Sequence, residues 1–190
     1  YKRQAIIPFD VGKEVKERFT DKTINELVKA CFDMGEVKTG ALIVIEQKNR
    51  LDEYIRTGIN VDAVLSSQLL INIFEHNTPL HDGAVVMRGN RIVAATCYLP
   101  LSDNMELSKQ LGTRHRAGVG ISEVSDSVTI IVSEETGQIS VAQEGKLERI
   151  VSSAKLREIL EKAQNKTIVD NNKLRQLLKG RSKNEGKTDQ

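Results

Sequence analysis

The chain has 190 residues, 39% of them hydrophobic, so it is long enough for one domain with a substantial core and too short for two ordinary domains. Its formal net charge of +2 is nearly balanced and creates no overall field that would attract nucleic acid, so any basic character is local. Cys31 and Cys97 lie in apolar runs without a nearby metal-ligand companion, which is typical of buried free thiols in a reducing compartment.

No apolar run is long enough to span a membrane, and the first residues contain no apolar signal core. We therefore expect this chain to be soluble, with no direct membrane contact. It begins at Tyr1 rather than at Met, which suggests a fragment or a processed form. Residues 1–19 are weakly patterned and are expected to form a linker or docking segment.

The first predicted elements are a helix and a buried strand. Asp21 to Met34 has an apolar face with helical spacing, and either Thr20 or Asp21 can cap its first turn. The apolar positions of this helix are Ile24, Leu27, Val28, Cys31 and Phe32. The uninterrupted apolar run Ala41 to Ile45 is typical of a central strand covered on both faces.

A surface loop and a second helix are expected next. Asn49 to Asn60 is polar with a Thr-Gly turn, although its few apolar residues could pack as a short helical turn. Asp62 is placed to cap the following helix, whose apolar stripe ends at Phe74, ahead of Pro79.

A polar octet, Asn77 to Ala84, separates this helix from an apolar strand and carries His81 and Asp82 beside Gly83. Asp82 can accept a hydrogen bond from a hydroxyl or bind a hard cation, and Gly83 lets a ligand approach the backbone without meeting a Cβ atom. An Asp-Gly pair before a strand is, however, more often plain turn chemistry. The octet alone leaves both interpretations open.

A hairpin and a short helix are expected after the octet. The strand Ala84 to Met87 returns as Ile92 to Tyr98 through a Gly-Asn turn, in which both residues can supply the positive φ of a tight reversal. Pro100 ends the second strand because it cannot donate to the ladder. We expect the short helix within Ser102 to Leu111.

A second polar cluster, Gly112 to Gly118, could bind an anion. If Thr113 caps a helix that begins at Arg114, the free amides of the first turn and the helix dipole would face the same anion as the arginines. The alternative is a solvated basic helix start, because arginine clusters are common on surfaces. Gly118 and Gly120 each cost roughly 1 kcal/mol relative to Ala inside a helix, which close packing or ligand approach would justify.

The rest of the chain adds strands and a late helix. Ser127 to Val132 is a β-branched strand that returns as Gln138 to Ala142, and a Glu-Gly pair closes a further hairpin. A helix is predicted around Leu156 to Leu160. The order of elements predicts an α/β fold: a single domain with a central mixed β-sheet flanked by helices on both sides.

The domain is expected to span residues 20–165. A weak C-terminal helix is predicted at residues 166–178. Residues 179–190 contain no apolar side chain and are expected to form a disordered basic tail.

The octet and the basic cluster together resemble the diadenylate cyclase family, whose signature pairs an Asp-Gly-Ala motif with an Arg-His-Arg motif. Here these are Asp82-Gly83-Ala84 and Arg114-His115-Arg116. The likeness covers about residues 40–145 and is strongest to the membrane-anchored bacterial type. It implies a cytoplasmic domain and, in the full-length protein, an upstream anchor at the cell membrane.

The resemblance implies that two ATP molecules condense to cyclic di-AMP and two pyrophosphates. Each ribose 3′-hydroxyl would attack the α-phosphate of the other ATP, which needs positioning and charge neutralisation. Asp82 beside Gly83 would orient the hydroxyl, and the Arg-His-Arg motif with Thr113 would hold the triphosphate. The remaining ATP-binding residues implied are Ala84, Tyr98, Leu99, Gly112, Ser133 and Glu134.

Mg²⁺ or Mn²⁺ is the expected cofactor, and both prefer oxygen donors. The expected ligands are Asp82, Glu135 and His81. A charged hairpin end is the alternative for Glu135, and more so for Glu134. A lone His such as His81 is more often structural than metal-bound.

Tyr98 and Leu99 leave the sheet close to the basic cluster and could form an apolar slot for adenine. The competing interpretation is a core tyrosine whose hydroxyl is hydrogen-bonded. A non-catalytic adenine-nucleotide sensor is the alternative to an enzyme, and a scaffold is the third hypothesis. The enzyme is favoured because a carboxylate beside a phosphate site would not help a pure anion sensor.

The product has two equivalent linkages, whereas the chain has one copy of each motif and no internal repeat. We therefore expect a homodimer, which can be transient, in which two subunits each present one ATP face to face.

Overall fold

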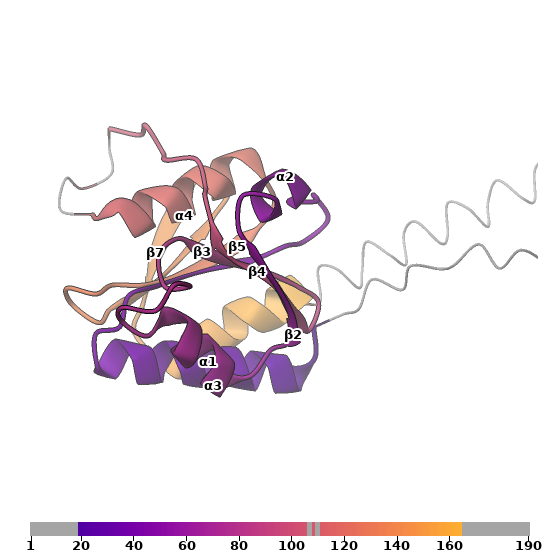
Figure 1. The fold of residues 1–190 in the computed structure, drawn as a ribbon. Coiled ribbons are helices and arrows are strands. Elements are labelled where there is room, and N and C mark those ends of the chain that lie inside the picture. The colour runs from indigo at the N-terminus through magenta and orange to yellow at the C-terminus, as the bar shows by residue number, and fades with distance from the viewer. Residues whose placement is uncertain (1–18, 106–107, 109–110, 165–190) are drawn as a thin grey trace, which may run out of the picture.

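The computed structural model describes residues 19–105, 108 and 111–164, which form an α/β fold on one mixed sheet (Figure 1). The 7-stranded sheet has the order β2-β4-β3-β1-β5-β6-β7. The central strand β1 (Ala41–Ile45) is parallel to β3 (Ala84–Arg88) and antiparallel to β5 (Val128–Val132). Every residue of β1 is buried, which confirms the strand predicted from its apolar run.

The outer strands extend the sheet as antiparallel pairs. β4 (Arg91–Cys97) pairs with β3, and β2 (Ile59–Val64) pairs with the other side of β4. Beyond β5, β6 (Ile139–Gln143) and then β7 (Lys146–Ile150) complete the order. The three predicted hairpin turns are therefore confirmed, although positive φ is found at Gly89 and not at Asn90 in the first of them.

Helices cover both faces of the sheet, as predicted (Figure 1). On one face lie α1 (Asp21–Glu36), α3 (Ser67–Phe74) and a helix over 153–164. On the other face lie α2 (Asp52–Ile55) and α4 (Thr113–Val124).

Successive side chains of β1 point to opposite faces of the sheet, so the apolar interior is divided into two cores. Ile43 and Ile45 pack in the larger core, together with α1, α3 and the helix over 153–164. Leu42 and Val44 pack in the second core, against α4. Helices thus cover much of both faces of the sheet, and the connections at the strand ends are the natural place to look for a ligand site.

The prediction of a surface loop from Asn49 to Asn60 is wrong. α2 occupies its centre, as the alternative of a short helical turn allowed, and β2 begins at Ile59. β2 lacks the apolar pattern of a strand because it is largely exposed. Its pairing with β4 is also irregular, with a register shift between Asn60 and Ala63 and a φ of 43° at Asp62.

Hydroxyl side chains cap α1 and α3. Thr20 caps α1 and accepts a hydrogen bond from the Thr23 amide at 3.4 Å, as predicted. Ser66, rather than Asp62, caps α3, and its hydroxyl accepts from the Leu69 amide at 3.2 Å. The cap predicted at Asp62 is wrong because this residue lies within β2.

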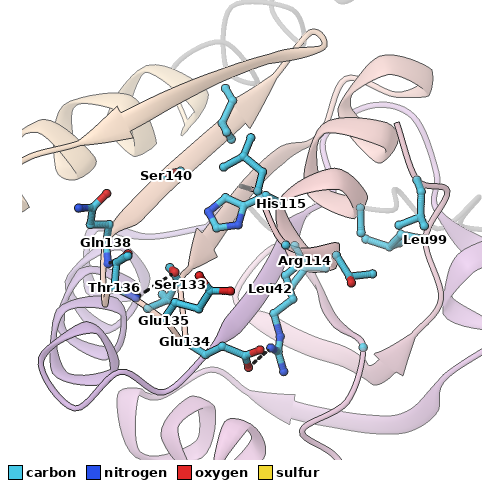
Figure 2. A pocket seen from close by; sticks show the side chains of 18 of the residues that line it. Leu42, Leu99, Arg114, His115, Ser133, Glu134, Glu135, Thr136, Gln138 and Ser140 are labelled. Carbon is cyan, nitrogen blue, oxygen red and sulfur yellow. Dashed lines mark hydrogen bonds and ion pairs between the residues drawn. The ribbon is translucent and has the colours of Figure 1, made fainter. Parts of the chain in front are cut away.

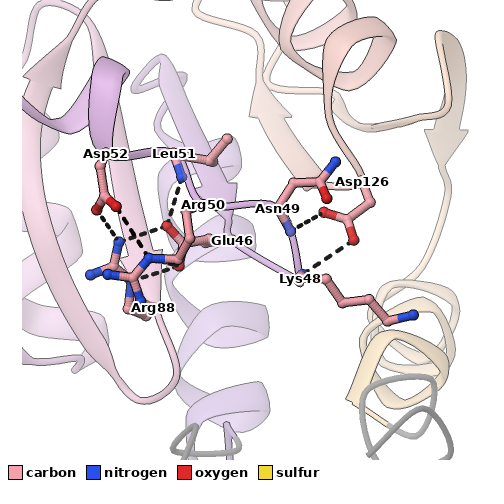
Figure 3. A network of polar contacts seen from close by, with 8 residues as sticks. All are labelled: Glu46, Lys48, Asn49, Arg50, Leu51, Asp52, Arg88 and Asp126. Carbon is pink, nitrogen blue, oxygen red and sulfur yellow. Dashed lines mark hydrogen bonds and ion pairs between the residues drawn. The ribbon is translucent and has the colours of Figure 1, made fainter. Parts of the chain in front are cut away.

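A network of polar contacts connects the sheet with α2, and it lies just after the last residue of β1 (Figure 3). The Glu46 carboxylate is buried, with 2% of the side chain exposed, and accepts from Arg88 Nε at 2.6 Å and from the Leu51 amide at 3.0 Å. Arg88 also donates to Asp52 Oδ1 at 2.7 Å. One side chain thereby joins β3, the segment after β1 and α2.

Other predictions had mixed outcomes. The described residues between Ser102 and Leu111 are not helical, so the short helix predicted there is not found among them. Cys31 and Cys97 are buried free thiols, as expected. Within the described ranges no helix is long and apolar enough to cross a membrane. The predicted docking segment except Phe19, the weak C-terminal helix and the basic tail lie outside the described residues.

Candidate active site

The candidate site lies at one end of the sheet, where the segments that connect β1, β3, β4, β5 and β6 come together. The register pairs Ala41 at the start of β1 with Val132 at the end of β5, and Ala84 at the start of β3 with Cys97 at the end of β4. Val132 in turn pairs with Ile139 at the start of β6. The segments before β1 and β3 and after β4 and β5 therefore converge with the connection into β6.

A cavity of about 960 Å³ opens at this end, beside the first turn of α4. Its size is at the upper end of small-molecule sites, which span roughly 300–1,000 Å³. Most of the predicted site residues line it: His81, Asp82, Gly83, Tyr98, Leu99, Gly112, Thr113, Arg114, His115, Ser133, Glu134 and Glu135. The structure thus brings together the octet and the basic cluster, which are about thirty residues apart in the sequence.

Asp82 is exposed in this cavity, and no described residue forms a hydrogen bond or ion pair with its carboxylate. It is therefore available to a hydroxyl or a cation. The backbone itself requires a glycine at position 83, apart from any approach of a ligand. The φ of Gly83 is 107°, and a Cβ atom there would lie 2.9 Å from the backbone of Thr96. Replacing Gly83 would displace β4 as well as the Asp82 turn.

His81 is held by its own turn. Its Nδ1 lies 2.6 Å from the Thr78 carbonyl oxygen, which can only accept, so Nδ1 carries the proton. In the neutral imidazole, Nε2 then keeps a lone pair that can bind a metal ion.

The start of α4 supplies further hydrogen-bond donors to the cavity. Gly112 is the N-cap residue, and no described side chain caps the helix. Thr113 is therefore the first helical residue and not the cap, so that prediction is wrong. An uncapped helix start presents free amides and the positive end of the helix dipole, which favours an anion more directly than a capped one.

Arg114 extends from this turn toward the loop after β5 and forms an ion pair with Glu134 (Figure 2). The pair lies over Gly40, where a Cβ atom would be 2.9 Å from the guanidinium and 3.0 Å from the carboxylate. Nε of Arg114 is buried and has no hydrogen-bond partner among the described residues. The arginine thus retains unused donor capacity beside the cavity.

His115 lies between α4 and the same loop, near Ser133 and Glu135 (Figure 2). Burial lowers the pKa of His115, and the Glu135 carboxylate opposes part of that change. The imidazole is therefore neutral at neutral pH and can donate or accept one hydrogen bond on each nitrogen.

Arg116 and Ala84, both predicted ATP-binding residues, do not line the cavity. Ala84 is buried in β3. The Arg116 guanidinium donates to the Ser102 carbonyl at 3.4 Å, and the Arg116 carbonyl accepts from the Ser102 amide at 3.0 Å. Arg116 therefore fastens the segment after β4 to α4.

That segment crosses α4 closely, which explains one of the helix glycines. A Cβ atom at Gly120 would lie 2.2 Å from the Pro100 carbonyl oxygen, and one at Gly118 would lie 2.9 Å from the Ile131 side chain. Close packing, the first of the two reasons predicted for these glycines, is confirmed.

One wall of the cavity is apolar. Tyr98 is 68% exposed and its ring is not part of the core, so the alternative of a core tyrosine is wrong. Leu99 and Leu101 line the same wall. A flat, partly exposed aromatic side chain beside leucines is suited to contact a purine base.

Sequence reasoning missed the other half of the lining. It comes from Leu42, Cys97, Leu101, Ser108, Leu111, Ala117, Val132, Thr136, Gln138, Ser140, Leu147 and Arg149. Burial raises the pKa of the Cys97 thiol to about 11, so it is protonated and unreactive at neutral pH. The polar members from β6 and β7 belong to no motif, and only the strand register places them here.

The expected metal ligands Asp82, His81 and Glu135 all line the cavity, but the described residues contain no cluster of three such side chains. This donor set still fits Mg²⁺ or Mn²⁺. Mg²⁺ in nucleotide sites is held by one or two carboxylates plus the phosphates of the substrate, rather than by a cage of protein ligands. Asp82 and Glu135 have no hydrogen bond or ion pair with any described residue and are free for that role.

The cavity of this α/β domain combines an uncapped helix start and an arginine, which suit an anion, with a free carboxylate and an apolar wall, and this combination is typical of nucleotide-binding domains. Residues 28–147 match the family described as DisA bacterial checkpoint controller nucleotide-binding, the DAC domain. The chain therefore belongs to this diadenylate cyclase family.

Two relatives of the chain carry names that agree with this family. The chain is 52% identical over 165 residues to the cyclic di-AMP synthase CdaA of Bacillus subtilis, covering 87% of this chain and 60% of that protein. It is 55% identical over 144 residues to a diadenylate cyclase of Listeria monocytogenes, covering 76% of this chain and 53% of that one. The chain thus spans somewhat more than half the length of these two relatives.

A solved structure, that of DacA from Staphylococcus aureus, shares the fold with a TM-score of 0.74 and 52% sequence identity. The match covers 75% of this chain and 95% of that one. The single mixed sheet with flanking helices is thus the fold of this family.

Proposed function

We propose that this chain is the catalytic part of a diadenylate cyclase, which condenses two ATP molecules into cyclic di-AMP and two pyrophosphates. One observation supports this most directly: an exposed, unpaired Asp82 shares a cavity with the uncapped start of α4 and Arg114. Family membership and the names of two relatives point to the same reaction.

The substrate would lie across the cavity with its base against Tyr98 and Leu99. Its triphosphate would pass the first turn of α4, where Thr113 and Arg114 offer amides and a guanidinium. Glu134 already pairs with Arg114 and keeps that side chain in place before ATP binds. Ser133, His115 and Gly112 also line the cavity and would lie along the phosphates.

Asp82 would accept a hydrogen bond from the ribose 3′-hydroxyl and orient its oxygen. That oxygen forms a bond to the α-phosphorus of the other ATP, the bond from this phosphorus to the oxygen bridging the β-phosphate breaks, and pyrophosphate leaves. The hydroxyl proton passes to a base or to water. Arg114 and the helix amides would stabilise the charge on the departing pyrophosphate.

A divalent ion, Mg²⁺ or Mn²⁺, would neutralise phosphate charge when bound. Asp82, Glu135 and Nε2 of His81 are the side chains that would hold it. Arg116 acts in this proposal through the packing of the segment after β4 and not by touching phosphate.

The residues 20–165 are proposed as the catalytic domain. In the full-length protein we propose an upstream membrane anchor, with this domain on the cytoplasmic side. Fractionating cells that produce the full-length protein tests this: it should sediment with membranes, and release by high salt alone would contradict an anchor.

The competing function is an adenine-nucleotide sensor without turnover. The free carboxylate favours the enzyme, because Asp82 would repel the phosphates of a ligand that is only bound. Incubating the purified chain with ATP and Mn²⁺ should yield cyclic di-AMP and pyrophosphate. ATP binding without any dinucleotide product would instead support the sensor.

Asp82→Asn tests the central residue. It keeps the shape and removes the charge, so we expect folding and ATP binding to persist and turnover to fall by about 10²–10⁴-fold, the usual contribution of a positioned acid or base. Asp103→Asn is the matched control, because Asp103 is exposed and does not line the cavity. A variant of Asp82 that cyclises ATP at the wild-type rate would remove this residue from the mechanism.

A further inference from the structure

Arg149 on β7 is exposed and lines the cavity, in a region without any sequence motif. The register pairs it directly with Ser140 of β6, so the two side chains lie on the same face of the sheet. Ser140 also lines the cavity, as does Leu147 two residues earlier on β7. Arg149 therefore reaches the cavity from the α4 side of the sheet.

The charges of the lining make this arginine different from Arg114. Asp82, Glu134 and Glu135 are the acidic residues of the lining, and Arg114 is already paired with Glu134. Arg149 has no hydrogen bond or ion pair with any described residue. Within the described part of the chain it is thus the one cation of the lining that no carboxylate neutralises.

The surroundings of Arg149 favour a polar ligand. Thr136, Gln138 and Ser140 lie along the same end of the cavity, and each can donate a hydrogen bond. Figure 2 shows these three side chains on the β6 side of His115, opposite Leu99. A ligand that places its base against the apolar wall and passes the start of α4 would extend its far end into this region.

We propose that Arg149 binds the β- and γ-phosphates of the nucleotide and so selects a triphosphate over a monophosphate. This inference rests on the proposed function for the identity of the substrate. Without Arg149, the only arginine that the described lining would offer a polyanion is Arg114, which is already ion-paired with Glu134. With it, the guanidinium fork can contact two phosphate oxygens at once. The same contact holds the pyrophosphate that leaves.

The test measures binding to the full chain of 3′-deoxy-ATP and 3′-deoxy-AMP, which lack the attacking hydroxyl and cannot be cyclised. Arg149→Gln should weaken the triphosphate about tenfold, as expected for one charge-assisted contact at a partly exposed site, and the monophosphate less than about twofold. Pyrophosphate should also inhibit the variant less strongly.

Lys146→Gln is the matched control, since Lys146 lies on the same strand with its side chain on the other face and does not line the cavity. It should leave both affinities unchanged. Equal weakening by the two variants would mean a general charge effect, and equal weakening of both nucleotides by Arg149→Gln would mean loss of structure; either result overturns the inference. Thermal unfolding of each variant checks that it folds.

The two proposals can fail separately. A wild-type chain that binds 3′-deoxy-ATP but makes no product from ATP contradicts the cyclase, while the Arg149 comparison still stands. A wild-type chain that cyclises ATP, with Arg149→Gln binding the triphosphate as tightly as before, contradicts only the role of Arg149. A chain that binds triphosphate no better than monophosphate overturns this role outright.

Discussion

At the scale of single residues, His115 couples the site to pH. Burial places its pKa below the ordinary value of 6.5, so protonation favours the unfolded chain, where the imidazole is solvated. The stability that His115 contributes is fully present above pH 6.5 and is lost as the pH falls below that value. Glu135, which faces the imidazole, limits the loss.

We therefore predict that the wild-type chain loses free energy of unfolding between pH 7.5 and pH 5.5, and that His115→Gln loses less. Urea denaturation at both pH values measures this difference. The carboxylates whose pKa values are lowered, those of Glu26, Asp52 and Glu158, titrate below this window and do not contribute to it. An identical loss in both proteins would show that His115 is not responsible.

The motif residues of the site could be predicted from the sequence, because their types and order are unusual. Asp82, Arg114 and His115 were found in this way and do line one cavity. Arg116 belongs to the same motif, yet its side chain lies on the other side of the helix start and contacts Ser102. Arg149 could not be predicted, because its position depends on a strand pairing that no local pattern encodes.

Among the strands and helices, the degree of burial determines which ones can be predicted from the sequence. β1 is buried on both faces and has an uninterrupted apolar run, so its bounds could be predicted. β2 is an outer strand without a buried residue, and its pattern does not differ from that of a loop. Tertiary pairing with β4, rather than local propensity, makes it a strand.

The network around Glu46 is an element-scale feature with a predictable energy. Arg88→Met would leave the buried Glu46 carboxylate with only the longer ion pair to Arg50, at 4.0 Å, in place of the 2.6 Å contact with Arg88. Breaking such a pair costs about 3–5 kcal/mol, and we expect about 3 kcal/mol here because Arg88 is 32% exposed. Nucleotide affinity should not change, since the network lies at the opposite end of β1 from the cavity.

Arg91→Met is the matched control, because Arg91 pairs with an exposed Asp62 and should cost less than about 1 kcal/mol. Chemical denaturation of both variants, with nucleotide titration of each, makes the comparison. Similar small costs for the two variants would mean that water reaches Glu46 and solvates it.

At the scale of the whole molecule, the proposed reaction needs two copies of the chain. The cavity described above holds one Asp82 per chain, whereas the product has two equivalent linkages. We predict that specific activity rises with enzyme concentration in the dilute range while nucleotide affinity per chain stays constant. Activity assays and sedimentation over the same concentrations test this. Constant specific activity in a range where the chain is monomeric would contradict the shared reaction.

The two outer strands also disfavour one kind of association, in which the sheets of two copies pair edge to edge. β2 is interrupted by its register shift and by the positive φ of Asp62, which bends its backbone away from a regular ladder. β7 carries Lys146, Glu148 and Arg149 within five residues. Irregular or charged margins disfavour the addition of another strand, which is the first step of fibrous aggregation. Edge-to-edge pairing of two copies, which would extend the sheet from molecule to molecule, is therefore disfavoured in this chain.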